Sequence, residues 1–200
     1  MTRIKICGLM QINDIEAVNT EKPDYIGFIF ANSRRAITPS QAFDLRNALS
    51  PNIIPVGVFV DEPIQNIISL VQHGVINAIQ LHGSENEQYI QKLKSITNKP
   101  IIKAIPIQNK GDVQKWEQSC ADHLLLDNIN GGTGQTFNWN LIGQTNTLFF
   151  LAGGLTTANV TEAIKKTTPF AVDVSSSVET NGAKDPAKIK NFIRRVRDEQ

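Results

Sequence analysis

Cysteine and histidine are both scarce in this sequence. Its 200 residues contain two cysteines, Cys7 and Cys120, and three histidines. Two cysteines cannot form a disulfide framework or a cysteine-rich zinc site, and no cluster of metal ligands accompanies the histidines. We therefore expect no bound metal, and the lack of a disulfide pattern favours the reducing cytoplasm as the compartment.

Neither sign of charge is in excess, and long hydrophobic runs are missing. Lysine and arginine number 20 against 19 aspartate and glutamate residues, a net charge of +1. This balance removes the usual electrostatic signature of a nucleic-acid-binding protein. The longest apolar stretch, Ile53 to Val60, contains Pro55 and is far too short to cross a bilayer. No apolar run follows the charged N-terminus, as it would in a signal peptide. We expect neither nucleic acid nor a membrane as a partner.

The sequence does contain a repeated pattern of short apolar runs separated by longer amphipathic segments. The runs are nearly continuous, which is typical of strands buried on both faces of a parallel sheet. Seven of the eight have a plausible helix behind them, and the sixth leaves room for only a short helix near Trp139–Ile142. The runs are Arg3–Cys7, Tyr25–Phe30, Ile54–Phe59, Ala78–Leu81, Pro100–Ala104, His123–Leu126, Leu148–Ala152 and Ala171–Val174.

Eight strand–helix units in one chain predict an α/β protein with a single (β/α)8 TIM barrel over residues 1–200. The clearest helical period runs from Ile64 to Val71, with Pro63 expected at the first helical position and Asp61-Glu62 as a cap. A doubly wound open sheet is the alternative. It would leave two unpaired edges that need protection.

In such a barrel the chemistry lies at the C-terminal ends of the strands. The first run ends in Cys7, whose thiolate could act as a base or nucleophile. The alternative is a buried and inert packing residue. The sixth run ends in Asp127, whose pKa would be raised by burial into the range of a general acid. The alternative there is a turn cap. Cys120 precedes a strand and is interpreted as structural.

Four of the loops after the strands carry further candidates. Gly153-Gly154 follows the seventh run and Ser175–Ser177 the eighth, where barrels often bind phosphate through backbone N–H groups. Arg34-Arg35 follows the second run and is either a solvated pair or a fork for a carboxylate or phosphate. The loop after the sixth run fits neither a Walker loop nor a dinucleotide fingerprint, and is interpreted as a lid. Its glycines are Gly131, Gly132 and Gly134.

Taken in order, these segments resemble the phosphoribosylanthranilate isomerase family. Each motif alone is weak, but the series is specific and covers nearly the whole chain. The segments are Lys5-Ile6-Cys7-Gly8, Val56-Gly57-Val58-Phe59, Gln80-Leu81-His82-Gly83, Leu125-Leu126-Asp127, Gly131-Gly132-Thr133-Gly134, Ala152-Gly153-Gly154-Leu155 and Val172-Asp173-Val174-Ser175-Ser176.

The resemblance implies a cofactor-free isomerase of tryptophan biosynthesis that acts on a phosphorylated aminosugar, N-(5-phosphoribosyl)anthranilate. It implies that Asp127 is the general acid that opens the furanose ring and that Cys7 is the general base that takes the C2′ proton. It places Arg35 at the anthranilate carboxylate and Asp173 near the anthranilate amine, with His82 also at the substrate.

Two positions depart from the family pattern. Ser177 stands where the family has glycine, and Asn138 stands where it has aspartate. Asparagine caps a helix about as well as aspartate. We expect Ser177 to have a negative φ and to begin a short helix over the phosphate.

Other functions remain as alternatives. One is a catalytically inactive barrel that binds a phosphorylated ligand, although both Cys7 and Asp127 are present. An indole-glycerol-phosphate synthase would need catalytic lysines, for which Lys5 and Lys103 are the candidates. A ribulose-phosphate epimerase would need metal-binding histidines and aspartates on several strands, which the sequence lacks. A monomer is expected, with a homodimer as the alternative.

Overall fold

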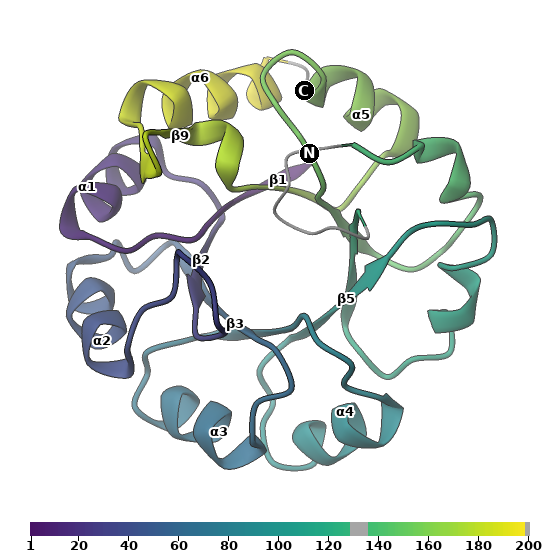
Figure 1. Cartoon of the computed structure of the whole chain (residues 1–200), viewed down its shortest axis with the longest axis horizontal. Coiled ribbons are helices and arrows are strands. Elements are labelled where there is room, and N and C mark those ends of the chain that lie inside the picture. The colour runs from purple at the N-terminus through teal and green to yellow at the C-terminus, as the bar shows by residue number, and fades with distance from the viewer. Residues whose placement is uncertain (129–135, 199–200) are drawn as a thin grey trace.

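The chain folds into a closed barrel of parallel strands surrounded by helices (Figure 1). The structure is a computed structural model, and it describes residues 1–128 and 136–198. Each strand pairs with the next along the chain, and the eighth pairs with the first, so no edge is left open. The predicted TIM barrel is confirmed, and the open-sheet alternative is wrong.

The strands lie close to the ranges that the apolar runs predict. The fifth begins one residue later than expected and extends to Pro106. The barrel strands are β1 (Arg3–Cys7), β2 (Tyr25–Ile29), β3 (Ile54–Phe59), β4 (Ala78–Leu81), β5 (Ile101–Pro106), β6 (His123–Asp127), β7 (Phe149–Leu151) and β8 (Ala171–Val174). A small antiparallel hairpin of β9 (Glu179–Thr180) and β10 (Ala183–Lys184) follows β8.

The helices form the outer ring of the molecule (Figure 1). They are α1 (Ile12–Glu21), α2 (Pro39–Ala48), α3 (Ile64–Gln72), α4 (Glu87–Lys94), α5 (Val160–Thr167) and α6 (Pro186–Arg197). The helix α6 buries Ile189, Phe192, Ile193 and Val196, the spacing expected for one apolar face. Within residues 1–128 and 136–198, none of the helices has the length and hydropathy needed to cross a membrane.

The layer outside the barrel differs from expectation after β5. In place of a helix, the described chain has the short 3-10 turn η1 (Gln114–Trp116). Ile107 and Val113 are the only fully buried apolar side chains between β5 and β6, too few for a helical stripe. After β6, the expected short helix is the 3-10 turn η2 (Trp139–Leu141), and the Asn138 side chain caps it by accepting from the backbone N–H of Asn140.

The start of α3 also differs from expectation. Pro63 is the residue before the helix, with an extended ψ of 131°, and not its first helical residue. Asp61 does not cap α3. Its carboxylate accepts hydrogen bonds of 2.8 Å from the backbone N–H and the hydroxyl of Ser84, so it ties the loop after β3 to the loop after β4.

Side chains alternate along each strand between the barrel interior and the helical layer. The lower interior is filled by an apolar cluster of Tyr25, Val56, Ala78, Ile102, Ala104, Leu125, Phe150, Ala152 and Ala171. Positions two residues further along several of these strands are polar. Because of this alternation, Lys5 and Cys7 share the interior face of β1, and Asp127 and Asp173 follow Leu125 and Ala171 on that face. The apolar cluster therefore forms the floor of a polar site.

Candidate active site

A cavity of about 300 Å³ opens at the C-terminal ends of the strands. All ten of the described residues that the sequence assigns to a site line it: Cys7, Arg35, His82, Asp127, Gly153, Gly154, Asp173, Ser175, Ser176 and Ser177. The predicted lid glycines Gly131, Gly132 and Gly134 lie outside the described residues. The structure thus brings together side chains from six different strand–loop units.

Cys7 ends β1 with its side chain in the cavity and is 7% exposed. Its neighbour across the sheet is Gly27 on β2, where an added Cβ would lie only 2.6 Å from the Cys7 sulfur. Glycine at this position therefore makes the space that the thiol occupies. Burial raises the pKa of Cys7 above its ordinary value, while the ammonium groups of Lys5 and Lys184 favour the thiolate and oppose that rise.

Lys5 is fully buried two residues before Cys7 and forms an ion pair with Asp173 on β8, with Nζ 2.9 Å from Oδ2. The two residues are direct partners in the β1–β8 register. Burial alone would lower the pKa of Lys5, but the charges of Asp173 and Cys7 outweigh it, and the net shift is upward. Lys5 thus stays an ammonium beside the thiol. From the sequence alone, Lys5 is only a weak candidate for a catalytic lysine of an indole-glycerol-phosphate synthase.

Asp127 ends β6 and is 9% exposed. Burial raises its pKa to about 6, and the negative charge of Asp173 adds to the rise. The expected upward shift of this carboxyl is therefore present. An added Cβ on Gly153 would lie 3.0 Å from its Oδ1, so the loop after β7 packs directly against the acid.

His82 follows β4 and points its Nε2 towards Asp127, 3.6 Å from Oδ2. Burial lowers the pKa of His82, so the ring is neutral at pH 7. The side-chain amide of Gln80 donates to Nδ1 over 2.9 Å. Since Nδ1 accepts this hydrogen bond, the single ring proton lies on Nε2 and faces the carboxyl. Gln80 is a site residue that the strand-end search missed, because it lies inside β4 and not after it.

The loops after β7 and β8 meet at one side of the cavity. Gly153 and Gly154 both have positive φ, 78° and 65°, which glycine adopts without strain. The hydroxyl of Ser177 donates to the carbonyl of Leu155 over 2.6 Å and joins the two loops. Ser177 is not among the described residues with positive φ, in agreement with the expectation, but it lies inside the 3-10 turn η3 (Ser176–Val178), which begins one residue earlier than expected.

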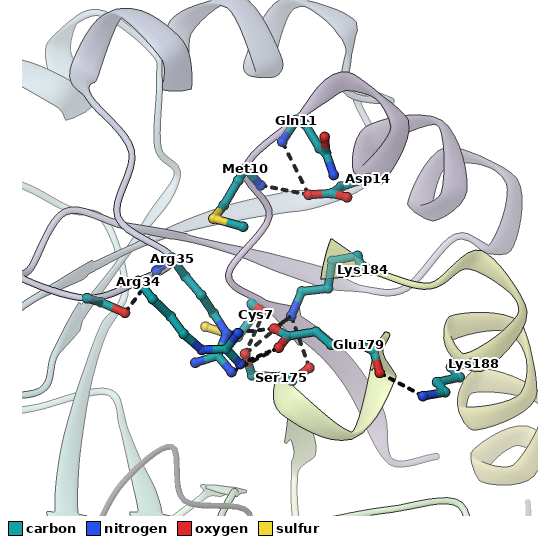
Figure 2. Close-up of polar contacts among 11 residues, drawn as sticks. Cys7, Met10, Gln11, Asp14, Arg34, Arg35, Ser175, Glu179, Lys184 and Lys188 are labelled. Atoms are coloured by element: carbon teal, nitrogen blue, oxygen red, sulfur yellow. Dashed lines mark hydrogen bonds and ion pairs between the residues drawn. The ribbon is translucent and has the colours of Figure 1, made fainter. Parts of the chain in front are cut away.

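Arg35 lines the cavity and is buried, which excludes the solvated alternative for this residue. It is held by Glu179, whose Oε1 lies 2.6 Å from Nε and whose Oε2 lies 3.1 Å from Nη2 (Figure 2). Arg34, with 55% of its side chain exposed, contacts the same carboxylate. Lys184 donates to Oε1 of Glu179 over 2.8 Å.

Glu179 and Lys184 were missed because they belong to the hairpin β9–β10, which the apolar runs do not show. A signal was present in the sequence. Asn181-Gly182 is a strong two-residue hairpin turn, and both residues have the positive φ that such a turn requires, 53° and 83°. This turn predicts that Glu179 pairs with Lys184, which is the register that the structure shows.

The residues proposed for other functions lie elsewhere or have other partners. Lys103 faces away from the cavity lining and donates to the carbonyl of Gly83 and to Glu85. Lys5 is occupied by Asp173. Cys120 uses its backbone N–H and carbonyl to bind Glu87 and Lys94, which fits a structural role. Within the described residues, no group of three His, Cys, Asp or Glu side chains could hold a metal ion.

The fold and the cavity agree with a match to a known family. The family model described as N-(5'-phosphoribosyl)anthranilate (PRA) isomerase matches residues 4–195. The chain belongs to the N-(5'-phosphoribosyl)anthranilate isomerase family. A curated family member from Thermoanaerobacter pseudethanolicus is 45% identical over 203 residues, which is 98% of each chain.

Solved structures of the family superpose on the whole barrel. The phosphoribosyl anthranilate isomerase of Thermus thermophilus gives a TM-score of 0.90 with 29% identity, over all of both chains. A second family structure, 33% identical, gives 0.85 over 99% of this chain and all of the other. That protein was solved in complex with reduced 1-(o-carboxyphenylamino)-1-deoxyribulose 5-phosphate.

Proposed function

We propose that this protein catalyses the Amadori rearrangement of N-(5-phosphoribosyl)anthranilate to 1-(2-carboxyphenylamino)-1-deoxyribulose 5-phosphate in tryptophan biosynthesis. The observation that carries the proposal is the pairing of Asp127 with Cys7. A buried carboxyl with a pKa of about 6 and a buried thiol beside an ammonium end two separated strands and line one cavity. These two groups can act as a general acid and a general base. Each positioned proton transfer of this kind raises the reaction rate by about 10²–10⁴-fold.

Asp127 acts first as the general acid. Its protonated form gives a proton to the furanose ring oxygen, the bond between that oxygen and C1′ breaks, and the anilino nitrogen lone pair forms a Schiff base at C1′. A carboxyl whose pKa lies near 6 keeps a protonated fraction at neutral pH and can donate this proton. Nε2 of His82 lies 3.6 Å from Oδ2 of the same carboxyl.

Cys7 then acts as the general base. Its thiolate takes the C2′ proton, the electron pair moves into the C1′–C2′ bond, and the iminium nitrogen becomes neutral. The resulting enolamine tautomerises to the ketone product. The thiolate is the form required, and Lys5 favours it electrostatically in a site where burial alone would disfavour it.

The phosphate is bound by backbone N–H groups from the loops after β7 and β8. Gly154 and Ser176 donate no hydrogen bond to another backbone group within the described residues, so these donors are available to an anion. The hydrogen bond from Ser177 to Leu155 fixes the two loops relative to each other. Aligned amides of this kind bind phosphate without a formal positive charge.

The anthranilate moiety is bound at the two opposite charges of the cavity, Arg35 and Asp173. Oδ1 of Asp173 is buried and has no hydrogen-bond partner in the described part of the chain, whereas Oδ2 is held by Lys5. A buried acceptor without a partner is costly unless a ligand supplies the donor. The anthranilate N–H is such a donor, and Arg35 faces the cavity to receive the carboxylate.

The proposed chemistry needs no metal or cofactor, and it needs Cys7 reduced. Both cysteines are free thiols, which supports a reducing cytoplasmic location. We propose a monomer, because the exposed large apolar side chains are spread over separate elements. These residues are Met1, Ile12, Phe43, Val60, Ile96 and Leu148. Light scattering during gel filtration tests this assignment.

The experiment that tests the function is the loss of anthranilate-type fluorescence when the purified protein meets freshly made phosphoribosylanthranilate, with a chelator present throughout. We expect turnover with wild-type protein and a loss of at least about 10² with Cys7→Ser. Binding of the reduced product analogue without turnover would instead indicate an inactive phosphate-binding barrel. Activity that a chelator abolishes and a divalent cation restores would contradict the metal-free mechanism.

A further inference from the structure

Glu179 gathers three cations around one buried carboxylate. Arg35 and Lys184 bind it from the interior, and Arg34 binds it from the surface (Figure 2). Burial alone would raise the pKa of Glu179, but the hydrogen bonds from Arg35 and Lys184 outweigh burial and lower it to about 2. The carboxylate therefore stays charged at any working pH. One negative charge among three positive charges leaves a local excess of two.

The contact with Glu179 occupies one specific edge of the Arg35 guanidinium. Nε and Nη2 each donate one N–H to the carboxylate in a two-point contact. A guanidinium has five N–H donors in a plane, so both N–H groups of Nη1 and one of Nη2 remain. These three form the other edges of the fork. Of the four side chains in this cluster, only Arg35 lines the cavity.

The hairpin fixes where Glu179 stands. The Asn181-Gly182 turn places Lys184 opposite Glu179 in the antiparallel pair. Lys188 at the start of α6 donates to the backbone carbonyl of Glu179 over 2.7 Å, and Lys184 also donates to the carbonyl of Ser175 over 3.0 Å. Glu179 is thus attached on one side to α6 and on the other to the loop that follows β8.

We propose that Glu179 is a positioning residue that sets the specificity of the cavity for a carboxylate-bearing substrate. It holds Arg35 by its Nε edge and so presents the Nη1 edge to the anthranilate carboxylate. The proposal rests on the proposed function, and it assigns to the β9–β10 hairpin a role in substrate recognition. Two-point Arg–carboxylate contacts depend on orientation as well as charge, so an arginine released from Glu179 would bind less well.

The test compares two substrates in the variant Glu179→Gln. One is N-(5-phosphoribosyl)anthranilate. The other is N-(5-phosphoribosyl)aniline, which has the same ribose phosphate and aromatic ring but no carboxylate. We expect the KM for phosphoribosylanthranilate to rise by roughly tenfold or more. A rise of this size is at the lower end of the range for the loss of a hydrogen bond to a charged group. We expect kcat to change less than about threefold and both constants for the aniline compound to stay within about twofold of wild type.

Three further variants make the result specific. Arg34→Ala removes a cation from the same carboxylate without reaching the cavity, and its KM should stay within about twofold of wild type. Arg35→Ala should show the same split between substrates as Glu179→Gln, and a larger rise in KM. Glu179→Asp keeps the charge among the three cations and should therefore fold, but it is one methylene too short for the two-point contact, so its KM should also rise.

The outcomes are distinct. An equal loss with both substrates in Glu179→Gln would show a merely structural role and overturn the proposal. An unchanged KM in Glu179→Asp, with correctly folded protein, would do the same. If wild-type protein turns over neither substrate, the proposed function fails first and the positioning role falls with it. Calorimetric binding of the reduced product analogue provides the same comparison without turnover.

Discussion

Lys5 and Asp173 form a buried ion pair of 2.9 Å between neighbouring strands of the barrel, and Cys7 lies two residues beyond Lys5 on the same face. The pair has two consequences for the thiol. Its ammonium supplies a positive charge that favours the thiolate, and its carboxylate keeps that ammonium charged although it is fully buried. A neutral pair of the same shape would remove both charges, and Lys184 would remain as the cation that opposes the rise that burial imposes on the pKa of Cys7.

The first prediction concerns this pair. In Lys5→Met, we expect the pKa of Cys7 to rise further, because a nearby cation has been removed. The rate of alkylation by iodoacetamide, measured against pH, should therefore have a higher midpoint than in wild type, and kcat should fall by at least about tenfold. Ultraviolet absorbance of the thiolate gives the same midpoint independently.

Lys103→Met is the matched control for Lys5→Met. It also removes a buried ammonium from an ion pair, with Glu85, but Lys103 is not among the groups that shift the pKa of Cys7. Removing one partner of a buried pair costs about 3–5 kcal/mol in either case, so both variants should be similarly destabilised. The expected difference is that only Lys5→Met moves the alkylation midpoint. Equal midpoints in the two variants would contradict the role of Lys5.

The second prediction concerns the two proton-transfer groups. Cys7→Ser and Asp127→Asn should each lower kcat by at least about 10² with much smaller changes in KM, because each group acts in proton transfer and not in binding. Steady-state fluorescence assays measure both constants. A variant that keeps more than about a tenth of wild-type kcat, with chemistry rate-limiting, would mean that the wrong residue has been assigned.

The third prediction is a pH dependence of stability that arises from Asp127. Its pKa is about 6 in the folded protein against the ordinary aspartate value of 3.8, so the folded state holds a proton that the unfolded state has released between these values. The carboxyl therefore costs stability as pH rises from about 4 to about 6, by roughly 2–3 kcal/mol once it is ionised.

Thermal unfolding measures this cost directly. Asp127→Asn should have a higher Tm than wild type at pH 7 and nearly the same Tm at about pH 3, which lies below both pKa values, so that the carboxyl is protonated in both states. Titration of the side-chain carboxyl by ¹³C NMR in substrate-free protein should show a midpoint near 6 that is absent in Asp127→Asn. A wild-type midpoint near 4 would contradict both the raised pKa and the acid role.

The fourth prediction concerns Ser177, which stands where the family pattern has glycine. Its backbone does not need positive φ, and its hydroxyl contacts the carbonyl of Leu155. We therefore expect Ser177→Gly to change KM less than about threefold, since backbone donors and not this hydroxyl hold the phosphate. Tenfold tighter binding by the glycine variant would show that serine impairs the site.

The sequence predicts the barrel and the positions of Cys7 and Asp127 well because both depend on regular spacing. Buried parallel strands are continuous apolar runs, and the C-terminal ends of two of these strands place Cys7 and Asp127 at the cavity. The helix expected after β5 is absent because that segment has only two fully buried apolar side chains. The packing in the structure shows which of these apolar side chains are buried, and the composition of the segment shows it less clearly.

The polar support of the site was harder to predict. Glu179 contacts Arg35 although 144 residues separate them in the sequence, and 168 residues separate Lys5 from Asp173. No local sequence pattern indicates a contact between residues so far apart in the chain. Gln80 is likewise a strand residue whose amide matters only because His82 lies two positions on. Such groups are recognisable once the strands are in register, since register determines which polar side chains meet.

The β9–β10 hairpin also bears on how this barrel could acquire a different substrate. Its charged residues touch Arg35 and the loop after β8, whereas Asp127 and His82 belong to the other half of the rim. In the proposed mechanism, recognition of the aromatic acid and delivery of the acid proton are therefore carried by separate segments of the chain. A graft of this hairpin that keeps Lys184, whose ammonium favours the Cys7 thiolate, could alter the accepted head group while the reaction itself is retained. Evolution or engineering of new aminosugar isomerases would then act on this short exchangeable module.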